Sequence, residues 1–240
     1  MAARAIELCA AYCPEKTLNA SQLRHLMESI AANALIGRDK SAVLVHIDSK
    51  LGKKDFRRII IHELMHIFCA KLEMGAEHFI DVYGSGTTPE AGRDDKVYDG
   101  IIVAGYSVWS EFIAQYYAVR LIDQESIDFS RIAGFITRLF GDVSISNLEG
   151  SRGAFAMICA YWFNCADFYE AYAALREPGA FMHAEEPHGN DAQKALRGCI
   201  EYLHIQMAKD RPWEISVDFI FGLGFQFSMF RTANSFYIAG

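Results

Sequence analysis

The chain has 240 residues, of which 52% are hydrophobic and 22% are charged, and it contains only 5 prolines. This composition excludes a disordered or low-complexity fibrous protein and is typical of a compact fold with its own core. The 30 acidic and 23 basic residues give a net charge of −7, and no run of Lys and Arg exceeds two residues, so we expect no nucleic-acid partner.

The sequence also bears on the cellular compartment. The longest uncharged stretch, residues 153–166, has 14 residues, whereas a membrane-spanning helix needs about 20. Glu7 interrupts the N-terminal segment where a signal peptide would be apolar. The 6 cysteines are scattered, and no two of them form a Cys-x-x-Cys pair, which favours free buried thiols. We therefore expect a cytoplasmic protein that has no membrane partner.

The first half of the chain is predicted to contain helices and one strand. The first 40 residues predict one or two helices. Residues 41–48 are rich in β-branched side chains and are bounded by charged ones, which predicts a strand. Asp55 is the expected N-cap of a helix from about Phe56 to Met74, and Gly75 is its expected stop.

The remainder of the chain is predicted to be mainly helical. Residues 75–100 contain glycines, a proline and several carboxylates, which predict an irregular loop. Further helices are expected at about 107–124, 152–176 and 191–209. After Pro212 the phenylalanines are spaced by two and four residues, a pattern that fits either a strand or a buried helix. We expect one domain over residues 1–240, with a helical subdomain from about residue 125.

One motif carries recognisable chemistry. Residues 62–66 read His-Glu-Leu-Met-His, the His-Glu-x-x-His pattern, inside the predicted helix. Four residues along a helix bring a side chain back to the same face about 6 Å further along the axis. His62 and His66 can therefore bind one zinc ion. Glu63 lies roughly 100° around the helix from His62, so it can act as the general base without being a ligand.

A catalytic zinc site needs a third protein ligand. Glu111 is the leading candidate because it is a lone carboxylate on an otherwise apolar and aromatic predicted helix. It follows the second histidine by 45 residues (111 − 66), which is ample for the chain to return. Asp81 and His78 remain open as alternatives.

In this order, His62, His66 and Glu111 resemble the ligands of the zincin metallopeptidases that use a glutamate, the gluzincins. The pattern Glu-x-x-Ala-x-x-Tyr-Ala-x-x-Leu, which starts at Glu111, is similar to the ligand helix of the ImmA/IrrE-like peptidases. The two matching segments are about 59–73 and 109–122. Gln115 stands where thermolysin-like members carry an aspartate, so the resemblance supplies no carboxylate partner for a ligand histidine at that position.

The resemblance implies an α+β fold, namely a mainly helical zincin-like domain with a small β-sheet next to the His-Glu-x-x-His helix. It implies a Zn²⁺ cofactor, a peptide or protein substrate, and pairing of the strand at residues 42–47 with an extended substrate. We therefore expect a zinc metallopeptidase in which Glu63 is the general base. The alternatives are a catalytically inactive zincin-fold protein that binds metal or a partner protein, and a metal-free protein in which the motif is only structural. The residue that stabilises the oxyanion and the oligomeric state stay open.

Overall fold

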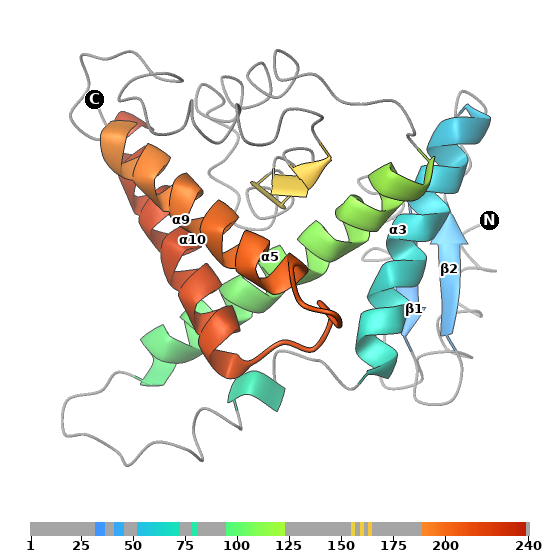
Figure 1. Ribbon diagram of the computed structural model, residues 1–240, viewed down its shortest axis with the longest axis horizontal. Coiled ribbons are helices and arrows are strands. Elements are labelled where there is room, and N and C mark those ends of the chain that lie inside the picture. Colours follow the sequence, from blue (N-terminus) through green and yellow to red (C-terminus); the bar gives the residue numbers. More distant parts are fainter. Residues whose placement is uncertain are drawn as a thin grey trace, which may run out of the picture. The chain divides into compact units, whose positions relative to one another are not determined.

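A computed structural model describes residues 32–36, 41–45, 52–72, 78–80, 95–122, 155–156, 159–160, 163–164 and 189–238 (Figure 1). Its elements in chain order are the strands β1 (Ala32–Ile36) and β2 (Ser41–Val45) and the helices α3 (Lys53–Lys71), α5 (Asp95–Ile122), α9 (Gly189–Met207) and α10 (Val217–Ile238). This part of the chain is mainly helical, as the sequence predicts.

The chain forms two compact units. Unit 1 comprises Met1–Glu73 and Tyr117–Gln124, and unit 2 comprises Met74–Tyr116 and Glu125–Gly240. Helix α5 therefore contributes residues to both units. The single domain with a subdomain from about residue 125 stays a prediction.

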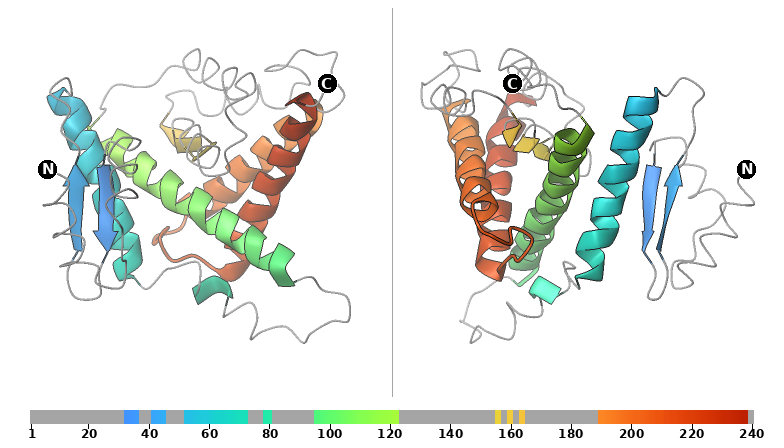
Figure 2. Two further views of the ribbon diagram at one scale, coloured as in Figure 1. Left: turned by 180° about the vertical axis from the view of Figure 1, so that it is seen from behind. Right: turned by 45° about the vertical axis from the view of Figure 1, so that its right-hand side comes forward.

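Unit 1 contains a two-stranded sheet and the helix that carries the His-Glu-x-x-His motif. Strands β1 and β2 pair in antiparallel fashion, with Ala32 opposite Val45 and Ile36 opposite Ser41. Helix α3 packs against both strands (Figure 2). Ala32 is buried. A small sheet thus lies next to the motif helix, as predicted.

Strand β1 corrects the prediction that the first 40 residues are helical. Its sequence, Ala-Asn-Ala-Leu-Ile, contains alanine and leucine, which favour helix in isolation. Only four residues separate β1 from β2 in the sequence, and pairing with β2 outweighs that local preference. For residues 41–45 the predicted strand is confirmed, and its continuation to residue 48 lies outside the described residues.

The start of α3 also differs from the prediction. The helix begins at Lys53, its N-cap residue is Gly52, and no side chain caps it. Asp55 lies instead in the first turn, where a carboxylate interacts favourably with the helix dipole, and its Oδ1 accepts a hydrogen bond from Arg58 Nη2 at 3.1 Å. The prediction that Asp55 is the cap is therefore wrong. The helix ends at Lys71, and the expected stop, Gly75, lies outside the described residues.

Helix α5 begins at Asp95, 12 residues before the predicted start (107 − 95), so the loop prediction is wrong for residues 95–100. The carboxylates and glycine that indicated a loop lie in the first two turns of a helix whose next turns are buried, with Ile102 at 0% and Val108 at 0% exposed. Burial of these turns outweighs the poor helix propensity of glycine and aspartate at the start.

The last two helices agree with the sequence more closely. Helix α9 confirms the helix predicted at 191–209, and the ambiguous segment after Pro212 is the helix α10. The two helices pack side by side (Figures 1 and 2). Of the helix predicted at 152–176, residues 155–156 and 159–160 are helical, and most of the others lie outside the described residues.

In unit 2 the helices α5 and α10 pack closely through aromatic side chains and glycines. Trp109 meets Phe219 edge to face with ring centroids 5.2 Å apart, and Tyr98 stacks on Phe221 at 5.7 Å. At Gly105 an added Cβ would overlap the backbone of Ile220 and Gly224 in α10. The backbones of the two helices therefore touch at this point, two turns before Glu111.

Two further sequence predictions concern membranes and cysteines. Among the described residues, no helix is long and apolar enough to cross a membrane. The described cysteines Cys69, Cys159 and Cys199 are free and buried, as predicted for them. Burial raises the pKa of the Cys69 thiol to about 11 and raises the pKa of the other two still further, so these thiols stay protonated and unreactive near neutral pH.

Candidate metal centre

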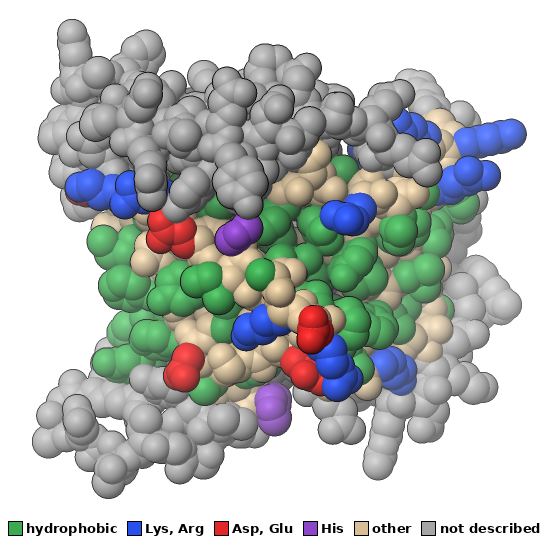
Figure 3. All heavy atoms as spheres, viewed as in Figure 1, with side chains coloured by type: hydrophobic (Ala, Val, Ile, Leu, Met, Phe, Trp, Pro, Cys, Tyr) green, Lys and Arg blue, Asp and Glu red, His purple; other side chains and the backbone are tan. Residues whose placement is uncertain are grey.

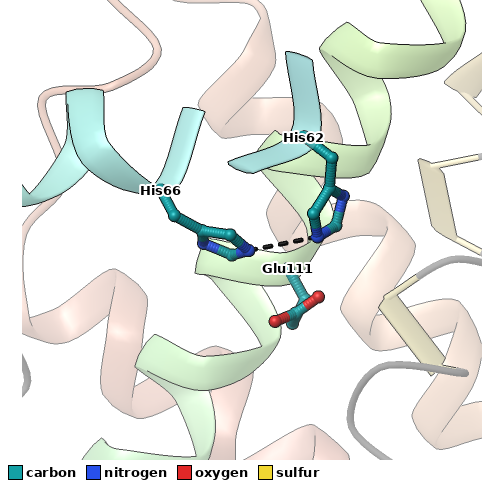
Figure 4. A group of neighbouring side chains, drawn as sticks. All are labelled: His62, His66 and Glu111. Atoms are coloured by element: carbon teal, nitrogen blue, oxygen red, sulfur yellow. Dashed lines mark hydrogen bonds between the residues drawn. The ribbon is translucent and has the colours of Figure 1, made fainter. Parts of the chain in front are cut away.

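The two histidines of the motif point toward one another from successive turns of α3 (Figure 4). Their Nε2 atoms are 3.1 Å apart. The ring centroids are 4.8 Å apart and the ring planes meet at 79°. Both side chains are half-buried. This arrangement follows from the spacing of four residues on a helix, which places His62 and His66 on one face.

The distance between the two nitrogens fits a shared metal ion. Two nitrogens that bind zinc at about 2.0–2.1 Å with a tetrahedral angle between them lie about 3.3–3.4 Å apart. The observed 3.1 Å is close to this value. Two neutral imidazoles approach equally closely when one Nε2–H donates to the other Nε2. The geometry therefore fits two histidines that bind one metal ion, but it does not require a metal.

Glu63 is the only buried carboxylate in the part of the chain that the structure describes, with 9% of its surface exposed. A buried charge is costly unless it is paired or hydrogen-bonded. If this position served only stability, an apolar residue would stabilise the fold better than a glutamate. The next position on the helix, Leu64, is 49% exposed, which shows that the polar and apolar residues are reversed here relative to ordinary burial.

Glu111 lies on α5, half-buried, and is followed by Phe112, Ile113 and Ala114, which are at most 1% exposed. Figure 4 draws it with the two histidines. One candidate ligand atom from each of His62, His66 and Glu111 lies within 4.8 Å of the other two, and this is the only such group of three or more among the described residues.

The rival third ligands take no part in this group as far as they can be followed. His78 is described and exposed, and its ring meets Phe79 with centroids 5.3 Å apart. Asp81 lies outside the described residues. The donor set of two imidazoles and one carboxylate is one that zinc accepts in catalytic sites.

Around the motif, the apolar residues that the sequence places next to the histidines are not all buried. Cys69 is 2% exposed, but Phe68, like Leu64, is exposed, at 41%. On the helix these two residues lie roughly 200–240° from His62, on the opposite face. The side of α3 that carries Leu64 and Phe68 is therefore more exposed to water than the side that carries the histidines and Glu63.

No protein-family model, curated protein or solved structure matches the chain. The case for a metal centre therefore rests on the chain's own residues and their geometry.

Proposed function

We propose that the protein is a zinc-dependent metallopeptidase with a zincin-like fold, acting on a peptide or protein substrate. The observation that carries the proposal is the convergence of the Nε2 atoms of His62 and His66 to 3.1 Å, on the helix that also buries Glu63.

In this proposal His62, His66 and Glu111 hold the metal. A histidine that binds through Nε2 must be neutral and must carry its proton on Nδ1. A bound zinc ion supplies a Lewis acid, which polarises the substrate carbonyl and lowers the pKa of water at the site toward about 7. The group of three ligand atoms within 4.8 Å supports this choice of ligands.

Glu63 has a separate role as the general base. Its carboxylate accepts the proton of the water that attacks the peptide carbonyl carbon, and it gives that proton to the amine nitrogen as the C–N bond breaks. Because Glu63 is buried, packing limits the orientations of its side chain. A carboxylate held in this way is better suited to repeated proton transfer than one that moves freely in solvent.

The sheet of unit 1 offers a means of holding the substrate. In the described residues it has two strands, so β1 and β2 each have one edge that no described strand occupies. An extended peptide can add to such an edge through main-chain hydrogen bonds. We propose that the substrate pairs with β2.

The metal content of the purified protein tests the site directly. We expect about one zinc per wild-type chain after purification in zinc, and a zinc affinity at least 100-fold lower for His62→Ala, because the pair of converging nitrogens is lost. His78→Ala is the matched control: it removes an exposed histidine outside the group and should retain the zinc. Metal analysis by mass spectrometry and titration with a zinc-sensitive dye give the two quantities.

Two outcomes would overturn parts of this proposal. Wild-type protein that contains no stoichiometric zinc would leave the motif with a structural role only. Wild-type protein that holds zinc but cleaves no member of a diverse peptide library would favour the inactive, metal-binding protein.

A further inference from the structure

Two basic residues continue the line of the histidines toward the start of α3. Lys54, Arg58, His62 and His66 follow one another at intervals of four residues on one continuous helix. Each interval advances about 6 Å along the axis and turns the side chain by only about 40°. Arg58 is thus one turn before His62 on the same side of the helix.

The positive charge at this end of α3 opposes the stability of the helix. Four of the first six residues, Lys53, Lys54, Arg57 and Arg58, are cationic, and Asp55 is the only acidic one. Figure 3 shows Lys and Arg side chains gathered over the start of α3. The N-terminus of a helix is the positive end of its dipole, so cations there are unfavourable. A local conflict of this kind, in a chain of net charge −7, indicates a functional reason for the cations.

Arg58 is placed to exchange partners. Its side chain is 33% exposed, and its Nη2 lies 3.1 Å from Oδ1 of Asp55, whose side chain is 52% exposed. Ion pairs between exposed groups are weak, so a substrate carboxylate can replace Asp55. Arginine also binds carboxylates through two parallel hydrogen bonds, which favours a planar anion at this position.

The distance along the helix sets where that carboxylate lies on the substrate. The Cα atoms of Arg58 and His62 are about 6 Å apart along the axis, and the bond to Asp55 draws the guanidinium up to one further turn away, to roughly 11 Å. An extended peptide advances about 3.3–3.6 Å per residue. The guanidinium can therefore bind a substrate group that lies two to three residues from the metal centre.

We infer that Arg58, aided by Lys54, makes the proposed peptidase select substrates that carry a carboxylate two to three residues from the cleaved bond. The carboxylate belongs to an acidic side chain or to a free C-terminus. This inference rests on the proposed function. A polyanion such as a nucleic acid is the less favoured ligand because the cations are confined to one end of one helix, whereas the chain as a whole is acidic.

The test compares Arg58→Gln with Arg57→Gln in the zinc-loaded full-length protein. The two variants lose the same charge at consecutive residues of α3, but Arg57 lies 100° further from the histidine side of the helix. The substrates are four synthetic peptide pools, with Glu and Asp or with Gln and Asn, and each with a free or an amidated C-terminus. We expect wild type and Arg57→Gln to cleave one kind of carboxylate-bearing pool with a kcat/KM about tenfold above its neutral counterpart.

In Arg58→Gln the ratio of kcat/KM for the carboxylate-bearing pool to kcat/KM for its neutral counterpart is expected to fall to about one. Arg58→Lys should restore part of this ratio. Asp55→Asn should raise the ratio, because it removes the competing carboxylate; a purely structural role of the Asp55–Arg58 pair predicts no such increase. Equal ratios in wild type and Arg58→Gln, or equal losses in both glutamine variants, would overturn the inference. So would preferential binding of a single-stranded DNA oligonucleotide that both variants weaken equally.

A binding experiment separates failure of the inference from failure of the proposed function. Suberic monohydroxamate, whose extended chain holds its carboxylate about 9 Å from the hydroxamate, and its carboxamide are zinc-binding probes that differ only in that carboxylate. We expect zinc-loaded wild type to bind the first about tenfold more tightly and Arg58→Gln to bind both equally, even if no peptide is cleaved. Equal binding by wild type would refute the role of Arg58 while the zinc site stands, and a wild type without zinc would refute both.

Discussion

Glu63→Gln is expected to abolish peptide hydrolysis while the protein still binds zinc. An amide cannot accept the proton of the attacking water, and loss of a general base lowers the rate by about 10²–10⁴-fold. Glutamine has nearly the volume of glutamate, so the buried position, 9% exposed, is filled as before. Parallel measurements of kcat/KM on a cleaved peptide and of zinc content distinguish the two effects.

Glu201→Gln is the matched control for this variant, because it makes the same chemical change at an exposed position on α9. It should leave both zinc content and kcat/KM unchanged. If Glu63→Gln is as active as wild type, Glu63 is not the general base. If it loses zinc together with activity, Glu63 supports the metal site itself rather than the proton transfer.

Gly105→Ala is expected to cause a large loss of stability in unit 2. The new methyl group would overlap the carbonyl oxygen of Ile220, and backbone atoms cannot move aside as the end of a flexible side chain can. Overpacking of this kind costs about 3 kcal/mol, which corresponds to a Tm lower by about 6–12 °C for a chain of this size. Gly224→Ala should have a similar effect, because its methyl group would meet the carbonyl oxygen of Ile101.

Gly100→Ala is the control, since it makes the same substitution in the same helix. A Cβ at Gly100 has no neighbour within 4 Å, so the change should stabilise α5 by about 0.5–1 kcal/mol through the better helix propensity of alanine. Thermal unfolding followed by circular dichroism compares the variants. A Gly105→Ala protein with the same Tm as wild type would show that α5 and α10 do not meet as closely as described.

The site was accessible to sequence reasoning wherever it depends on local helix geometry. His62, Glu63 and His66 lie on one helix, and their spacing alone predicts that the two imidazoles converge. The choice of Glu111 over Asp81 or His78 depends on which distant segment returns to α3, and spacing along the chain does not specify that. Arg58 lies one interval of four residues before His62 but outside the His-Glu-x-x-His pattern, so the motif alone does not indicate it.

The fold shows the same limit. Strand β1 has the composition of a helix and becomes a strand only because β2 pairs with it. In α10 the sequence shows no clear apolar face, because phenylalanine stands at both buried and exposed positions. Phe219, Phe227 and Phe230 are buried, whereas Phe225 is 46% exposed. A helix that is apolar on nearly every side loses the 3.6-residue periodicity by which it would be identified.

The sharing of α5 between the two units has a consequence for the order in which the protein folds during synthesis. Unit 1 is discontinuous: a ribosome that has released Glu73 has delivered the sheet and α3, but not Tyr117–Gln124. At 5–20 residues per second, the intervening 51 residues (124 − 73) take roughly 3–10 s to appear. For that time the two histidines belong to an incomplete unit, and unit 1 is complete only once the end of α5 has been synthesised.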